Sequence, residues 1–88
     1  MNEINKTIEK RTETYGDFTE ISKISQRLFD TITTASNYDK LSYVHKEAYK
    51  MIFHKIARSV CGNCYILDTA HDIVGYATLL ETYLRNEK

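Results

Sequence analysis

Two cations and two carboxylates are spaced so that each pair falls on one face of a predicted helix. Lys55 and Arg58 lie three residues apart, and Asp68 and Asp72 lie four apart, so each pair can face a common partner. Lys55 and Asp72 also fall inside helical stripes that are otherwise apolar, where a charge is costly unless it is paired or solvated. One interpretation is a salt-bridge network that fixes helix register, with Asp68 as a helix cap.

A binding site for an anion is the second interpretation of the same residues. Arginine offers a planar fork of donors and lysine a point charge, and both suit phosphate oxygens. The chain has seven tyrosines and no tryptophan, and a tyrosine ring can stack on a base. We therefore predict that the protein binds a small anionic ligand, a nucleotide, in a pocket lined by Tyr15, Asp17, Lys55, Arg58, Asp72 and Tyr76.

A magnesium-dependent nucleotide pyrophosphohydrolase is a competing interpretation. Enzymes of the MazG-like type are similar small bundles, in which acidic motifs on two helices hold Mg²⁺. Magnesium bound directly by protein needs converging carboxylates. Asp68 and Asp72 are matched on the middle helix only by Glu47, which stands among lysines. The sequence thus favours a binder with no catalytic residue and no cofactor, and magnesium is expected only under the hydrolase alternative.

The two cysteines form a C-x-x-C pair that raises the possibility of a zinc site. Cys61 and Cys64 are flanked by His54 and His71. A lone C-x-x-C needs two further ligands in reach, and His54 precedes Cys61 by about two helical turns. We therefore predict no metal site and interpret the cysteines as small apolar residues that fill a tight turn.

Start and stop signals divide the chain into three main helices, expected at residues 18–34, 43–60 and 69–85. Asp17, Ser42 and Asp68 are the predicted N-caps, and Glu20 would complete a capping box with Asp17. Gly62 is expected to end the middle helix in the left-handed conformation. Residues 1–14 are predicted to form a short, frayed helix or arm. The prediction is an all-α bundle in a single domain, residues 1–88.

The apolar arcs of the second and third main helices are wider than a lone bundle needs. Each spans roughly 200° of the helical wheel. The extra width predicts a second buried face and hence a homo-oligomer. Gly75, unfavourable inside a helix, would allow another helix or a ligand to approach the backbone there. A face that docks on a host enzyme is the alternative. The residues that widen the arcs are Tyr49, Phe53, Tyr76, Leu79 and Tyr83.

Composition excludes several classes of partner. The formal net charge is zero, with 12 basic and 12 acidic residues, which argues against non-specific binding of nucleic acid. No apolar run approaches the length of a membrane span, and the N-terminus lacks the apolar core of a signal peptide. Two cysteines in such a chain predict reduced thiols in a cytoplasm.

Three motifs resemble those of a short phage and prophage family of uncharacterised function. They are Tyr15-Gly-Asp17, Lys55-Ile-Ala-Arg58, and Asp68-x3-Asp72-Ile-x-Gly75-Tyr76-Ala-x-Leu79. Members of the family typically run Y-G-D, K-[IL]-A-R and D-x-W-x-D-I-x-G-Y-A-x-L, and the resemblance covers roughly residues 12–84. It implies a phage-type protein in a bacterial host cell, where a nucleotide binder could sequester a signal of host defence. Ala70 stands where the family usually has tryptophan, so a stacking surface is missing at that position.

Overall fold

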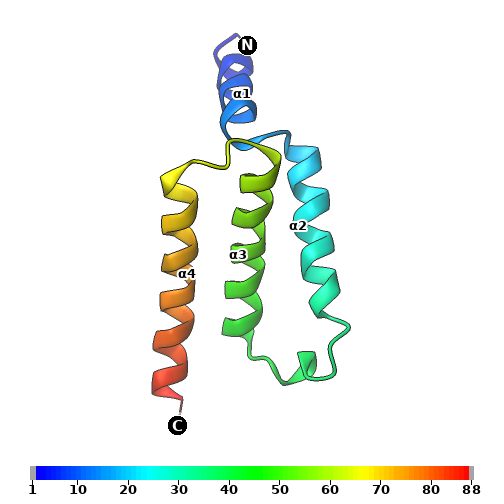
Figure 1. The fold of residues 1–88 in the computed structure, drawn as a ribbon, viewed down its shortest axis with the longest axis vertical. Coiled ribbons are helices and arrows are strands. Elements are labelled where there is room, and N and C mark those ends of the chain that lie inside the picture. Colours follow the sequence, from blue (N-terminus) through cyan, green and yellow to red (C-terminus); the bar gives the residue numbers. More distant parts are fainter. Residues whose placement is uncertain (1, 88) are drawn as a thin grey trace.

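The computed structural model describes residues 2–87, which form four α-helices (Figure 1). The predicted all-α class and the three main helices are confirmed. The N-terminal segment is a regular helix that continues to Tyr15. The helices are α1 (Asn2–Tyr15), α2 (Phe18–Ile32), α3 (Tyr43–Cys61) and α4 (Leu67–Asn86), with a short 3-10 turn, η1 (Tyr38–Lys40), between α2 and α3.

Two of the three predicted N-caps are confirmed. The Asp17 carboxylate accepts the Glu20 amide at 3.2 Å, although no reciprocal bond from the Glu20 side chain is formed within the described residues. The Ser42 hydroxyl accepts the His45 amide at 3.2 Å, and the His45 ring accepts the Ser42 amide in return, which makes a capping box. The prediction for Asp68 was wrong. α4 begins two residues earlier than predicted, at Leu67, and Asp68 lies in its first turn, where the helix dipole stabilises a carboxylate.

Helix α3 lies in the middle of a layer, with α2 and α4 on either side of it (Figure 1). On the α2 side, the Phe53 ring meets Phe29 edge-on, with centroids 6.4 Å apart. On the α4 side, Lys55 pairs with Asp72. Helix α3 therefore packs against both neighbours, while α2 and α4 have no comparable contact with each other.

The core of this layer is small. Only Ile21, Ala48, Ala57 and Leu80 are buried apolar residues, and no large side chain is fully buried within the described part of the chain. The accessible surface is 6881 Å², whereas a folded monomer of 10.3 kDa is expected to expose about 5,400 Å². The difference is about 1,500 Å², and α1, in which residues 3–13 are all exposed, contributes to it. None of the helices in residues 2–87 combines the length and apolarity needed to cross a bilayer.

Two glycines hold the end of α1 against the end of α3. Gly16 has φ of +89°, and a Cβ on it would overlap the Cys61 carbonyl. A Cβ on Gly62 would overlap the backbone of Tyr15 and Gly16. The prediction that Gly62 is left-handed was wrong, since its φ is −132°. Glycine is needed at Gly62 for the close approach of two backbones, while the left-handed residue is Gly16.

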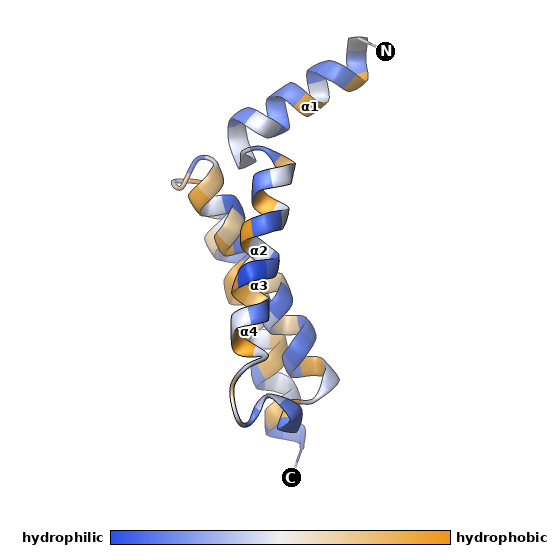
Figure 2. Ribbon diagram, turned by 90° about the vertical axis from the view of Figure 1, so that its right-hand side faces the viewer, coloured by the Kyte–Doolittle hydropathy of each residue, from blue (hydrophilic) through white to orange (hydrophobic). Residues whose placement is uncertain are grey.

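Beyond this junction, α1 leans away from the layer and is mostly hydrophilic (Figure 2). The Asn63 amide donates to the Thr14 carbonyl at 2.9 Å, so the last turn of α1 is tied to the loop after α3. Ile4 and Ile8, on the projecting part of the helix, are more than half exposed. The junction therefore sets where Tyr15 lies relative to α3.

Candidate functional site

The tyrosine at the end of α1 carries two guanidinium groups against its ring. Arg58 Cζ, from α3, lies 4.9 Å from the centroid of the Tyr15 ring, and Arg11 Cζ, one turn earlier in α1, lies 5.4 Å from it. Both distances fall within the range of cation–π attraction. We call these three residues the arginine–tyrosine cluster. It forms because the glycine junction brings the last turn of α1 over the C-terminal half of α3.

A cavity of about 200 Å³ adjoins the cluster. No carboxylate lines it, and neither Arg11 nor Arg58 forms an ion pair with any residue between 2 and 87. Two cations that face a cavity without an opposing carboxylate repel each other and favour an anion between them. The lining residues are Ile8, Arg11, Thr12, Tyr15, Gly16, Phe18, Ile21 and Arg58.

Lys55 and Asp72 form an ion pair that joins α3 to α4, with 2.9 Å between Nζ and Oδ2. The lysine side chain is only 13% exposed, whereas that of the aspartate is 45% exposed. The hydrogen bond from the Lys55 ammonium lowers the pKa of the Asp72 carboxyl, burial opposes this shift, and the charges of Lys55, His71 and Arg58 add to the lowering. The pair therefore satisfies the buried lysine and leaves the carboxylate partly in water, as the network interpretation expected.

The predicted site residues divide among four places. Tyr15 and Arg58 meet in the arginine–tyrosine cluster, and Lys55 meets Asp72 between α3 and α4. The side chain of Asp17 caps α2 and is exposed. Tyr76 borders a separate, shallow hollow of about 580 Å³ along α4, which shares no lining residue with the cavity at the cluster.

Two titratable groups beside the cluster have shifted acidity. Burial lowers the pKa of His54, and the charges of Arg58 and Lys55 lower it further, so this ring is neutral at pH 7 and adds no cation. Burial raises the pKa of the Cys61 thiol, and the carboxylates of Glu20 and Asp17 raise it further. Cys61 is therefore a protonated thiol at neutral pH and a weak nucleophile.

Within residues 2–87, no three His, Cys, Asp or Glu side chains come close enough together to hold a metal ion. The histidines that flank the C-x-x-C pair therefore do not complete a zinc set with Cys61 and Cys64, both of which are free. Glu47, Asp68 and Asp72 likewise form no acidic cluster of the kind that a protein-bound Mg²⁺ requires.

Sequence reasoning missed Arg11 and Phe18 as members of the site. Arg11 precedes Tyr15 by four residues, which places both on one face if the segment is helical. That signal was present, but residues 1–14 were interpreted as a frayed arm. Phe18 is 73% exposed at the start of α2 and borders the cavity only because the Gly16 turn places α2 there.

No family model, no curated protein and no solved structure matches this chain.

Proposed function

We propose that the protein binds a small anionic ligand of the nucleotide class at the arginine–tyrosine cluster. The supporting observation is the pair of guanidinium groups, from Arg11 and Arg58, that share the Tyr15 ring and border a cavity without a carboxylate. Guanidinium groups bind phosphate oxygens through paired donors. The exposed ring of Phe18, also on the cavity, offers a surface for a base.

The size of the cavity limits what it can enclose. Pockets for drug-sized ligands have volumes of about 300–1,000 Å³, so a cavity of about 200 Å³ suits one part of a nucleotide, with the remainder over the exposed rim. We therefore centre the proposed site on the junction between α1 and α3, and not on the middle of α3. Lys55 is paired with Asp72, so we assign no phosphate contact to this lysine.

We also propose that the protein acts as a homo-oligomer and that its setting is the phage-infected bacterial cell. The exposed apolar side chains support self-association. The phage setting is supported by the motif resemblance, and with it the proposal that the bound nucleotide is a host-defence signal that the protein sequesters.

Thermal melts followed by circular dichroism test the binding proposal. AMP, GMP, ATP and inorganic pyrophosphate are each added to the wild type, to Arg58→Gln and to Arg11→Gln. A ligand that binds only the folded state at a hundred times its Kd stabilises it by about 2.7 kcal/mol, so at least one probe should raise the wild-type melting temperature. Both variants should lose that rise.

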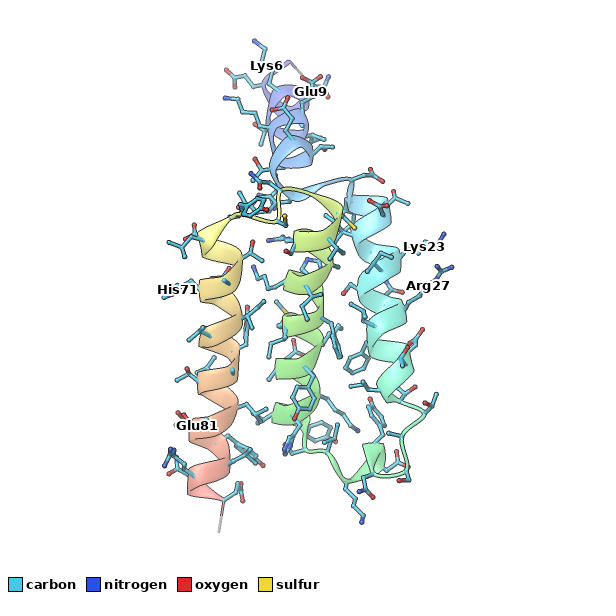
Figure 3. The ribbon with its side chains drawn as sticks, in the orientation of Figure 1. Lys6, Glu9, Lys23, Arg27, His71 and Glu81 are labelled. Carbon is cyan, nitrogen blue, oxygen red and sulfur yellow. The ribbon has the colours of Figure 1, made fainter. Side chains whose placement is uncertain are left out.

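Arg27→Gln is the matched control, because Arg27 is exposed on α2 and projects away from α3 (Figure 3). It should retain the full shift. An equal shift in all four proteins would show that any binding is independent of the cluster, and no shift with any probe would refute the proposal. Chromatography of the recovered nucleotides separates binding from hydrolysis, since a binder returns them intact with Mg²⁺ present.

A further inference from the structure

An apolar groove runs along one face of the α3–α4 pair. It consists of two adjoining hollows, one of about 410 Å³ and one of about 150 Å³. The first is bordered by Tyr49 and Ile52 of α3 and by Ala77 and Leu84 of α4. The second continues along the same two helices toward the α3–α4 loop. We call the two hollows together the α3–α4 groove.

The residues along this groove repeat at coiled-coil spacing. Within the lining, positions separated alternately by three and four residues form a continuous row on each helix, which is the pattern of a seam that packs against another helix. On α4 the row also alternates large with small side chains over most of its length. The rows are Tyr49, Ile52, Ile56 and Ser59 on α3, and Ile66, Ala70, Ile73, Ala77, Leu80 and Leu84 from the start of α4 onward.

Of these rows only Leu80 is buried within the chain, and Ala70, Ala77 and Leu84 are exposed. α2 lies on the far side of α3, and α1 reaches only the C-terminal end of α3. The molecule exposes about 1,500 Å² more than a compact monomer of its mass. A stable interface removes about 800 Å² from each partner. The excess surface of the whole chain is therefore larger than the area that one such interface removes from each partner, and α1 contributes to that excess.

The charges at the edge of the groove allow an identical chain to bind there. Its charged lining residues are Glu81 and Arg85, which pair with each other at 3.2 Å. Two copies brought face to face around a two-fold axis thus meet no uncompensated like charge. We infer that a second copy of this chain docks on the α3–α4 groove, so that α3 and α4 of both subunits form a four-helix core. This inference rests on the self-association proposed above.

Sedimentation equilibrium at micromolar concentration tests the inference with a matched pair of variants. Ala77 and Thr78 are adjacent, and both are exposed in one chain, but only Ala77 lines the groove. The wild type should have twice the mass of 10.3 kDa. Ala77→Glu places two carboxylates in the symmetric core and should raise the dimer dissociation constant at least about 100-fold. Thr78→Glu should change it by less than about threefold.

Hydroxyl-radical footprinting of the wild type decides the question even if Ala77→Glu fails to fold. Oxidation of Tyr49 and Leu84 should fall several-fold as concentration rises through the association range. Tyr43 and Leu79, which are exposed away from the groove, should keep their reactivity. These two residues are the internal controls.

Three results would overturn the inference. A dimer that survives Ala77→Glu unchanged, or one that protects Leu79 and leaves Leu84 reactive, would place the interface on another face. A monomer at every concentration would remove the self-association as well. The nucleotide-dependent melting shift is measured separately, so none of these three results is confused with failure of the binding proposal.

Discussion

Gly75→Ala tests whether anything approaches the face of α4 that carries Gly75. Gly75 lies in the middle of the helix, and a Cβ built on it meets no atom within 4 Å. If nothing approaches that face, alanine gains only helix propensity, which is worth about 0.8–1.0 kcal/mol relative to glycine. For a domain of this size, 1 kcal/mol corresponds to a rise in melting temperature of about 4–8 °C. Thermal melts at a fixed protein concentration measure this rise directly.

Gly62→Ala is the control, because it makes the same chemical change where the space is absent. A Cβ there overlaps the backbone of Tyr15 and Gly16, so we expect a loss of about 1–3 kcal/mol. The expected signs are thus opposite for two identical substitutions. A Gly75→Ala protein that melts lower than the wild type, or that loses mass on sedimentation, would refute the reasoning. It would mean that a second chain or a ligand approaches the backbone at Gly75.

Two further predictions concern the Lys55–Asp72 pair. In urea denaturation, Asp72→Ala should lower the free energy of unfolding more than Lys55→Met does, because it strands the more buried charge. The double change Lys55→Met with Asp72→Leu should be at least as stable as Asp72→Ala. A larger loss of stability from Lys55→Met than from Asp72→Ala would contradict the assignment of Lys55 as the buried partner. The second prediction concerns pH. The pKa of Asp72 is lower in the folded protein than the usual value of about 3.9. The contribution of Asp72 to stability is therefore complete above pH values near the usual pKa, and it is lost as the pH falls through the folded pKa. The stability advantage of wild type over Asp72→Asn should therefore shrink below about pH 4, and an advantage that stays constant from pH 6 to pH 3 would contradict it.

Local signals were sufficient to predict most helix boundaries. The caps at Asp17 and Ser42 act over three residues, so the information needed to place them is contained in the adjacent sequence. The start of α4 was misplaced because Asp68 is as suitable for the first turn as for the N-cap. Gly62 was misjudged for a different reason. Its conformation is set by the backbone of Tyr15 and Gly16, which no local rule contains.

The pairing of Lys55 with Asp72 was also within reach of the sequence, because a charge in an apolar stripe must find a partner or water. Two such charges on successive antiparallel helices are natural partners, and the structure joins them. The sequence did not decide whether the pair or the neighbouring arginine belonged to a ligand site. That choice depended on which side of α3 each residue faces relative to α1.

The sequence by itself therefore determined the all-α class, the main helices and the apolar width of α3 and α4, because these follow from hydrophobic periodicity and capping over a few residues. Only the tertiary structure decided that α2 and α4 lie on either side of α3, and that Arg11, Tyr15 and Arg58 come together. The angle at which α1 leaves the layer depends on the contact between Gly16 and the Cys61 carbonyl. That contact joins segments far apart in the chain, and no local periodicity encodes it.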